Sequence, residues 1–453
     1  MPGHQRVVRS AAATRRDRTV TVLAAILLAA MALAAVVVGP SAEADQDHSA
    51  TARAMSTDVA APTDGPAYPA ATGATRYRGL AFDTCSAPPR GAMQAWRSSP
   101  YAAVGIYLSG RNRACTQPEL TAAWVKDVTE MGWKLLPVNL GSQAPCRDNK
   151  RKVPMKAKTA AATGTAEAAV AVLAAKNLGL LPGTPIYADV EPYNSGRATC
   201  VRAVAMYLSA WTRELHRQGY LSGLYGTLGS GLTDATTRYA STAYARPDAV
   251  WFARWDRSPS LKGWVNVPDN RWSQWQRVKQ YRGDHRETHG GVPMLIDSDS
   301  VDAPVATVAR SYPVTSAATL NFRRSPRSSA DAVGSAEPGT EVAVVCQVTG
   351  TEEAGSTVWN KLADGSYVSD AYVGAGGRKP LPACRYPVPV LTAGGAFTHT
   401  GPSATEPTAA KVPLGALAWL QCTDSSGTWV QLPGGLYLSR TDLASFSAPL
   451  QNC

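Results

Sequence analysis

The sequence has few charged residues for its length and only one apolar run long enough to cross a membrane. Charged residues make up 17% of the 453-residue chain, and hydrophobic residues make up 45%. A disordered chain would carry less apolar surface, so these proportions indicate folded domains, two or three at this length. Because only residues 20–38 could span a bilayer, a membrane protein with several spans is excluded.

Several motifs of metal binding and catalysis are also missing. No CxxC pair occurs, which argues against zinc knuckles and thioredoxin chemistry. No GxSxG elbow occurs in residues 78–305, and the glycines near residue 226 match neither a dinucleotide nor a phosphate loop. His285 to His289 resembles HExxH, but Glu287 stands one place too late, and the glycines on both sides predict a loop. We therefore expect no metal and no cofactor.

The chain is basic, with a formal net charge of +11. Its longest basic cluster, Arg147 to Lys158, contains no aromatic residue, so it lacks the stacking platform typical of a nucleic-acid site. A basic surface suits the anionic polymers of a cell envelope equally well. We predict a cell-wall polysaccharide or peptidoglycan as the partner, and no nucleic acid. The oligomeric state stays open.

Residues 1–44 are organised like an export signal. Five arginines precede the apolar run, Gly39-Pro40 ends it, and Ala42-Glu43-Ala44 forms a small-x-small cleavage site. The run is longer than a usual signal core, so an uncleaved membrane anchor is the alternative. Arg15-Arg16 raises twin-arginine export as a second route. Residues 45–77 are predicted to form a flexible linker, and the rest of the protein is expected outside the cell.

Residues 78–305 alternate short apolar strands with helical patterns, which predicts parallel strands joined by right-handed crossovers. Eight strands over this length predict an α/β fold, a (β/α)8-type TIM barrel, with a flat doubly wound sheet as the alternative. Helices are expected over 93–98, 118–131, 165–178 and 200–218, the last ending at Gly219. The helix after the fifth strand is doubtful and the one after the sixth is missing, so the second half should be irregular. The predicted strands are Gly79–Asp83, Ala103–Leu108, Lys134–Asn139, Pro185–Glu191, Leu221–Tyr225, Val250–Trp255, Val278–Tyr281 and Pro293–Asp297.

From residue 311 on, the sequence predicts short strands and little helix, in two repeats over 315–384 and 385–453. Trp359-Asn360-Lys361-Leu362 and Tyr367-Val368-Ser369 return as Trp429-Val430-Gln431-Leu432 and Tyr437-Leu438-Ser439. This pattern resembles bacterial SH3-like repeats of secreted wall-active proteins. Small domains of this size have thin cores that disulfides reinforce. The repeat therefore predicts two bonds, Cys346–Cys384 and Cys422–Cys453.

The other four of the eight cysteines lie in the barrel region and also follow the cleavage site. An even number outside the cytosol predicts disulfides. Each follows one of the first four predicted strands: Cys85, Cys115, Cys146 and Cys200. Neighbouring strands favour pairing the first with the second and the third with the fourth. Pairing the second with the third also joins neighbours, so the alternative stays open.

Four carboxylates stand at or near the ends of predicted strands: Asp83, Asp189, Glu191 and Asp297. The reacting groups of barrel enzymes lie at the carboxyl ends of strands. Side chains alternate along a strand, so Asp189 and Glu191 point the same way. Crowded carboxylates repel, so one should stay protonated near neutral pH while another is ionised, as glycosidic cleavage requires. The alternative for each acid is a helix cap or an ion pair.

Aromatic and amide side chains near the same strand ends are candidates for binding a sugar. A flat ring face can pack on a sugar ring, and an amide can bond its hydroxyls; the alternative is ordinary core packing. The candidates are Tyr107, Tyr187, Tyr225, Trp255, Gln280 and Tyr281.

These segments together resemble the glycoside-hydrolase-like domain of exported actinobacterial envelope proteins, a family that is similar to the Chalaropsis-type lysozymes. The resemblance implies a barrel of five β/α units followed by bare strands. It implies that Glu191 is the general acid and that Asp189 steers the N-acetyl group of the substrate or the developing cation. Asp83 and Asp297 would complete the acidic floor. The likeness is carried by the segments 79–85, 104–107, 143–146, 186–193, 219–225, 280–281 and 290–297.

Together these features predict a secreted, wall-associated glycoside hydrolase that cleaves an envelope glycan, with peptidoglycan as the first candidate. The SH3-like repeats would hold the enzyme on the wall, since two weak modules on one chain gain from effective concentration. One alternative is a catalytically inactive glycan-binding or scaffolding protein on the same fold. Another is a hydrolase of a capsule or an arabinogalactan-type polysaccharide.

Overall fold

The computed structural model describes residues 74–273, 275–374, 381–446 and 450–453. The predicted signal over 1–44 and most of the predicted linker over 45–77 lie outside these residues. Strand β1 (Arg76–Asp83) begins just inside the predicted linker. In the part of the chain that the structure describes, no helix combines the length and apolar character needed to cross a bilayer.

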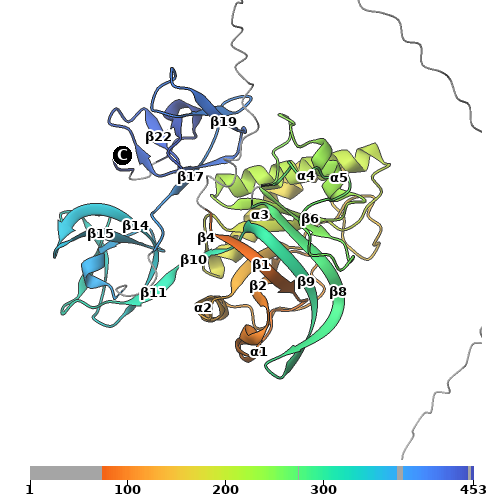
Figure 1. The fold of residues 1–453 in the computed structure, drawn as a ribbon, viewed down its shortest axis with the longest axis horizontal. Coiled ribbons are helices and arrows are strands. Elements are labelled where there is room, and N and C mark those ends of the chain that lie inside the picture. Colours follow the sequence, from red (N-terminus) through yellow and green to blue (C-terminus); the bar gives the residue numbers. More distant parts are fainter. Residues whose placement is uncertain (1–73, 274, 375–380, 447–449) are drawn as a thin grey trace, which may run out of the picture. The chain divides into compact units, whose positions relative to one another are not determined.

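Eight strands close into a barrel in the order β1-β2-β3-β5-β6-β7-β8-β9 (Figure 1). The closed sheet excludes the flat doubly wound alternative. Five of the predicted strands shift by at most three residues at either end, and the third is unchanged. The last two are longer than predicted, because β8 continues eight residues and β9 seven residues beyond the predicted ends. After β1 the barrel strands are β2 (Tyr101–Ser109), β3 (Lys134–Asn139), β5 (Pro185–Asp189), β6 (Leu221–Gly226), β7 (Ala249–Ala253), β8 (Arg277–His289) and β9 (Val292–Pro304).

The direction of the last strand differs from the prediction. Neighbouring strands from β1 to β8 pair in parallel, whereas β9 is antiparallel to both β8 and β1. The prediction of parallel strands throughout is therefore wrong for β9. The segment from His285 to His289, predicted as a loop, belongs to β8, and the hairpin turns at Gly290 and Gly291. Both glycines have positive φ, which lets the chain reverse without steric cost.

Helices cover the first half of the barrel and are sparse over the second. Thr121 explains why the second helix begins later than predicted, because its side chain accepts the Trp124 N–H and caps the helix. The described residues between β7 and β8 contain no helix, in agreement with the predicted irregular second half. The helices are α1 (Arg90–Ala95), α2 (Ala122–Glu130), α3 (Ala160–Asn177), α4 (Ala198–Arg217) and α5 (Gly231–Thr237), with 3-10 turns at 96–98 and 157–159.

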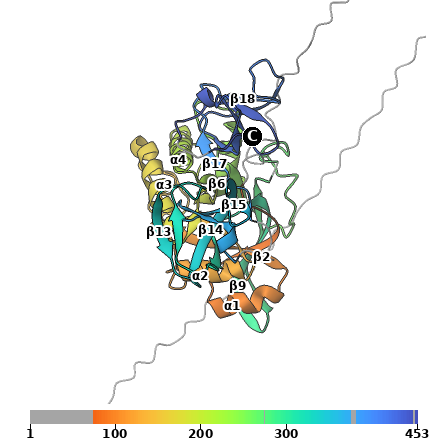
Figure 2. The ribbon, with the colours of Figure 1, turned by 90° about the vertical axis from the view of Figure 1, so that its left-hand side faces the viewer.

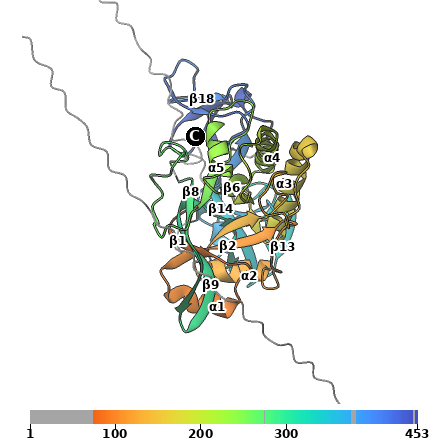
Figure 3. The same ribbon diagram turned by 90° about the vertical axis from the view of Figure 1, so that its right-hand side faces the viewer.

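The core has two layers on the two sides of the barrel wall. Figures 2 and 3 show α3 and α4 side by side, and apolar side chains of the strands pack against them. Inside the barrel, the rings of Tyr187 and Trp251 meet edge to face with their centroids 5.5 Å apart. Gly223 on β6 leaves room for this pair, since a Cβ there would lie 2.3 Å from the Tyr187 ring. The filled interior ends below a polar mouth at the carboxyl ends of the parallel strands.

Beside the barrel, β4 (Leu180–Leu181) and β10 (Thr307–Val308) form a short pair, and the rest of the chain is all β. The first region contains β11 (Arg310–Pro313), β12 (Leu320–Arg323), β13 (Ala332–Ala336), β14 (Glu341–Glu353), β15 (Ser356–Leu362) and β16 (Tyr367–Ser369). The second contains β17 (Tyr386–Pro389), β18 (Ala396–His399), β19 (Thr408–Val412), β20 (Leu417–Leu420), β21 (Cys422–Thr423), β22 (Trp429–Gln431) and β23 (Tyr437–Ser439).

The sequence repeat is also a repeat of strand register. Trp359 lies opposite Ser369 in the first region, and Trp429 lies opposite Ser439 in the second. Each region has its own small apolar core and one disulfide. Both predicted disulfides are confirmed, Cys346–Cys384 and Cys422–Cys453.

Candidate active site

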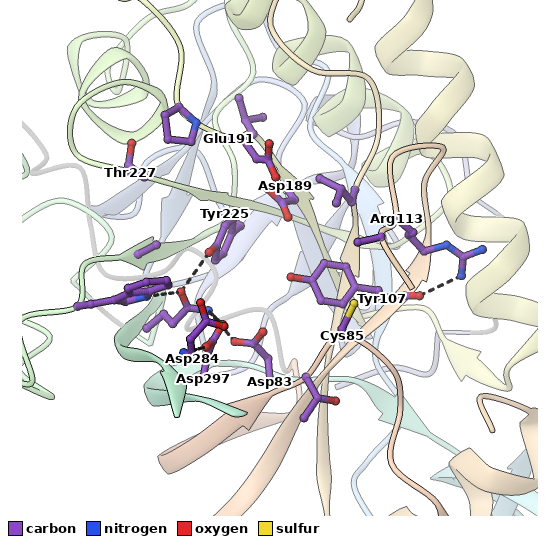
Figure 4. Close-up of a pocket in the computed structure, with 18 of the residues that line it drawn as sticks. Asp83, Cys85, Tyr107, Arg113, Asp189, Glu191, Tyr225, Thr227, Asp284 and Asp297 are labelled. Atoms are coloured by element: carbon purple, nitrogen blue, oxygen red, sulfur yellow. Dashed lines mark hydrogen bonds between the residues drawn. The ribbon is translucent and has the colours of Figure 1, made fainter. Parts of the chain in front are cut away.

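A cavity of about 680 Å3 opens at the carboxyl ends of the parallel barrel strands. All four predicted carboxylates line it, and this volume lies within the ~300–1,000 Å3 typical of ligand sites. Figure 4 shows them in two groups, Asp83 with Asp297 and Asp189 with Glu191. Asp83 and Asp189 are the last residues of β1 and β5, and Glu191 follows in the loop after β5.

Asp297 reaches the cavity for a different reason than predicted. It does not end its strand, since β9 continues to Pro304. Because β9 runs antiparallel to β1, Asp297 lies directly opposite Asp83, at the level where β1 ends. Asp299, two residues on, faces the same side of the strand and is fully buried, with Oδ1 accepting a hydrogen bond from Trp251 Nε1 at 2.8 Å. Of the two alternating acids, Asp297 therefore lines the cavity and Asp299 lies below it.

Gln280 on β8 connects the acids to the aromatic wall. Its Nε2 donates to Asp83 Oδ2 at 2.8 Å and to Asp297 Oδ2 at 3.1 Å. Its Oε1 accepts from Tyr225 Oη at 3.2 Å and from Trp255 Nε1 at 2.9 Å. The amide therefore orients two carboxylates and two rings at once, and it is itself buried.

Burial shifts the protonation of this floor. Desolvation, then the nearby Asp297 carboxylate, raises the pKa of Asp83 to about 7. Burial also raises the pKa of Asp297, although its Oδ1 accepts the Asp284 backbone N–H at 2.6 Å. Burial, with the charge of Asp83, raises the pKa of Asp299 well above its ordinary value. Near neutral pH the floor therefore holds protons that isolated aspartates would have lost.

The second acidic group is held by Gln143, a fully buried side chain in the loop after β3. Its Nε2 donates to the backbone carbonyl of Asp189 at 2.7 Å, and its Oε1 accepts the backbone N–H of Glu191 at 2.8 Å. One amide thus fixes the peptide that carries both acids. Burial, then the charge of Glu191, raises the pKa of Asp189 well above its ordinary value, while Lys152 opposes the shift. Lys152 Nζ lies 3.7 Å from Glu191 Oε1.

Four of the six predicted sugar-binding residues line the cavity: Tyr107, Tyr225, Trp255 and Gln280. Trp255 is 58% exposed, so one face of its indole is open to a ligand. Tyr187 is fully buried within the barrel and does not reach the cavity, so its prediction as a binding residue is wrong. Tyr281 is also absent from the lining, because it alternates with Gln280 along β8 and faces the other side of the strand.

Three cations and one further acid line the cavity without having been predicted: Arg113, Lys152, Arg254 and Asp284. Lys152 belongs to the basic cluster seen in the sequence, which was the available signal. Gln143 stands in a segment of the family resemblance but carries no charge or periodic pattern. Nothing local in the sequence predicts that its amide bridges two backbone groups.

Two disulfides brace the loops around the cavity. Cys85, which lines it, pairs with Cys115, and Cys146 pairs with Cys200. The favoured pairing of neighbouring strands is therefore confirmed, and the alternative bond between Cys115 and Cys146 is excluded. The bond between Cys146 and Cys200 restrains the loops that carry Lys152 and Glu191.

The segment that resembles a zinc motif forms a hydrogen-bonded cluster on the β8–β9 hairpin. Glu287 Oε1 lies 3.0 Å from His285 Nε2, and its Oε2 lies 3.0 Å from His289 Nε2. Tyr101 Oη donates to the same carboxylate at 3.1 Å. Within the described ranges no group of histidines, cysteines and acids has the arrangement of a metal site.

Residues 94–301 match the sequence model of the Rv2525c-like, glycoside hydrolase-like domain. This match confirms the predicted glycoside-hydrolase-like family for that part of the chain, which contains Asp189, Glu191 and Asp297, while Asp83 precedes it. No curated protein matches the chain.

The solved structures that are similar to about half of this chain share little sequence with it. One is the Tat-secreted protein Rv2525c of Mycobacterium tuberculosis, with 14% identity and a TM-score of 0.36 over 51% of this chain and 99% of that one. An uncharacterized Bacillus stearothermophilus protein shares 19% identity, with a TM-score of 0.35 over 49% and 95% of the two chains. A family 25 glycosyl hydrolase of Bacillus anthracis shares 15% identity, with a TM-score of 0.30 over 50% and 89%.

Proposed function

We propose that the glycoside hydrolase-like domain is a TIM-barrel enzyme that hydrolyses an O-glycosidic bond of a cell-envelope glycan, peptidoglycan in the first place. The observation that carries this proposal is the convergence of four carboxylates from three parts of the chain in one open cavity. Paired carboxyl groups with different protonation are the chemical requirement of glycoside hydrolysis. Aromatic faces beside them suit a sugar ring.

Glu191 is proposed as the group that donates the proton to the glycosidic oxygen. It lies beyond the end of β5 on a longer side chain, and it is more exposed than Asp189 on the same peptide. As the carbon–oxygen bond breaks, the proton moves from Glu191 to the leaving oxygen. The resulting carboxylate then takes a proton from the water that completes hydrolysis.

The other acids support this step without transferring the proton. Asp189, kept protonated by burial, has an O–H that donates a hydrogen bond to the substrate, which suits the oxygen of an N-acetyl group. Asp83 and Asp297 lie side by side on the Gln280 amide, and burial raises the pKa of both, that of Asp83 to about 7. The negative charge that this pair holds would stabilise the positive charge that develops on the sugar.

We also propose that the protein is exported and that residues 315–384 and 385–453 are SH3-like wall-binding modules. Four disulfides suit an oxidising compartment outside the cytosol. The repeated strand register of the two small β regions supports a duplicated module. Deleting residues 311–453 should reduce retention on purified cell walls at least ~10-fold in a sedimentation assay. Equal retention of the shortened and full chains would remove the tethering role.

The test of catalysis is Glu191→Gln, which keeps the shape of the side chain and removes its proton transfer. Release of reducing ends from purified peptidoglycan should fall ~10²–10⁴-fold, while binding to the wall persists. Glu130→Gln, a matched change on the exposed surface of α2, should leave the rate unchanged. If wild type and Glu191→Gln release the same amount, the catalytically inactive glycan-binding alternative replaces the enzyme. Release from a capsular polysaccharide but not from peptidoglycan would change the substrate instead.

A further inference from the structure

The basic segment 147–158 lies beside the cavity, and the proposed hydrolysis leaves it without a role. It contains six basic residues and one acid and forms most of the connection from β3 to α3. Asn112 holds it down, because its Nδ2 donates to the Val153 carbonyl at 2.9 Å and its Oδ1 accepts the Val153 N–H at 2.8 Å. The backbone N–H of Asp148 also bonds the carbonyl of Pro192, directly after Glu191. The segment is thus built into the wall of the site.

Lys152 brings the charge of this segment into the cavity. Its side chain is 15% exposed, and its Nζ donates to the Asn112 carbonyl at 2.9 Å while lying 3.7 Å from Glu191 Oε1. An ammonium group has three N–H donors. These two contacts account for two directions, so a third can serve a ligand in the cavity that Lys152 lines.

Two arginines extend the cationic rim to other loops. Arg113, after β2, donates from Nη1 to the Tyr107 carbonyl at 3.2 Å, and Arg254, after β7, pairs with Asp256 at 3.3 Å. Both are exposed, whereas Asp83 and Asp189 are buried. The cavity therefore has acids in its floor and cations around its rim. Five acids line the cavity, and burial raises the pKa of Asp83 and Asp189 among them. The cavity therefore repels an anionic ligand less than five ionised carboxylates would.

We infer that the glycan bound here is anionic, with its carboxylate or phosphate groups held by Lys152 and the basic segment 147–158. This inference rests on the proposed function and specifies its substrate class. A neutral sugar ring lies over the acidic floor, and the charged substituent lies against the rim. Guanidinium and ammonium groups bind carboxylate and phosphate through charge-assisted hydrogen bonds. The absence of aromatic residues in the segment favours a glycan over a nucleic acid.

The test measures equilibrium binding of the full chain, carrying Glu191→Gln so that polymers stay intact, to matched ligands. The ligands are soluble peptidoglycan strands, the same strands with their carboxylates amidated, a phosphodiester-linked wall polymer, and a single-stranded oligonucleotide. Lys152→Gln should weaken binding of the charged glycan at least ~10-fold and leave the amidated strands unaffected. Lys152→Arg keeps the charge and should restore most of the affinity. Unchanged binding of the amidated strands by Lys152→Gln shows that its loss of affinity for the charged glycan is not a folding defect.

The basic segment is tested separately with a charge-matched control. Lys150→Gln/Arg151→Gln should weaken binding ~3-fold at low salt and less at high salt, because both side chains are exposed. Arg90→Gln/Lys126→Gln removes the same charge from exposed positions on α1 and α2 and should have no effect. Whichever of the peptidoglycan strands and the phosphodiester polymer binds more tightly identifies carboxylate or phosphate as the recognised group.

The outcomes separate this inference from the proposed function. Equal affinity for charged and amidated strands, or tighter binding of the oligonucleotide than of any glycan, would overturn the anionic-glycan inference. Charge-dependent binding without release of reducing ends by the wild-type chain would remove the hydrolase and keep the anionic-glycan site. Release of reducing ends by the wild-type chain, together with binding that does not depend on charge, would keep the hydrolase and remove the anionic-glycan site.

Discussion

The two halves of the barrel build one cavity by different means. In the first half, β1 to β6, parallel strands alternate with helices, and the polar groups project from strand ends and loops that two disulfides restrain. In the second half, β8 and β9 form a long hairpin, and the polar groups Gln280 and Asp297 project from within strands. In the first half, polar side chains of the cavity stand at strand ends and on loops, and disulfides restrain these loops. In the second half, they stand on a pair of hydrogen-bonded strands, and side-chain hydrogen bonds hold them in place.

In the proposed reaction, this difference corresponds to different roles for the acids of the two halves. Asp189 and Glu191, from the first half, are held by contacts of their backbone with Gln143, and both residues line the cavity. Asp297, from the second half, accepts hydrogen bonds from Gln280 and from the Asp284 backbone. A group whose oxygens are already bonded is suited to stabilise charge rather than to transfer a proton.

The largest expected effect separates the acids of the two halves. Glu191→Gln should lower kcat/KM on peptidoglycan by ~10²–10⁴-fold, because the amide has no proton to give to the glycosidic oxygen. Asp297→Asn should cost only ~10-fold, since the new Oδ1 can still accept one of the two hydrogen bonds. Rates measured as reducing ends released test both variants. Equal losses would mean that the two halves contribute alike.

A smaller effect is expected on stability when the covalent bracing of the first half is removed. Cys146→Ser/Cys200→Ser should lower the free energy of unfolding by ~2–5 kcal/mol, measured by urea denaturation. Removing Cys85–Cys115 should cost ~0.5 kcal/mol less, because it closes 30 rather than 54 residues. Hydrogen exchange should rise in the loops after β2 and β3. Faster exchange in the β8–β9 hairpin as well would show that the halves are not independently braced.

The smallest effect concerns the floor where the two halves meet. Asp83 has a pKa of about 7 in the folded protein and 3.8 as its ordinary value. Well below pH 3.8 the carboxyl is protonated in both the folded and the unfolded forms, so its ionisation contributes no difference in stability. As pH rises from 4 to 7, the unfolded form ionises first, and the folded state loses stability.

Asp83→Asn removes this cost while keeping an acceptor for Gln280. The variant should therefore be more stable than wild type by ~1–3 kcal/mol at pH 8 and by little at pH 4, measured from thermal unfolding across pH. A stability difference that does not change with pH would show that the carboxyl is not held protonated.

Sequence patterns were sufficient for the parts that depend on local order. Short apolar runs separated by turns predict most strands to within a few residues, and Gly219 ends α4 in a left-handed conformation as expected. The repeat at Trp359 and Trp429 predicts two of the disulfides, and the order of the strands favours the other two without excluding a bond between Cys115 and Cys146. The positions of these features follow from residue types and from their order along the chain.

The misplaced features depend on partners far away in the chain. Tyr187 follows the pattern of a surface aromatic at a strand end, yet its ring is buried because Gly223 on the next strand leaves space for it. The hairpin between β8 and β9 makes β9 antiparallel, but the apolar pattern of these two strands does not differ from that of the parallel strands. No local pattern could indicate that Gln143 or Gln280 would join acids from separate strands.

The amino-acid sequence by itself determined which carboxylates, cysteines and repeated modules this protein has, because chemistry and short-range periodicity are written residue by residue. Only the tertiary structure decided that Asp297 stands opposite Asp83, that one amide bonds both, and that Lys152 reaches Glu191. The physical reason is that strand pairing and desolvation are set by groups distant in the chain. Proton affinities in the cavity arise from that burial and from neighbouring charges, and neither exists before the barrel closes.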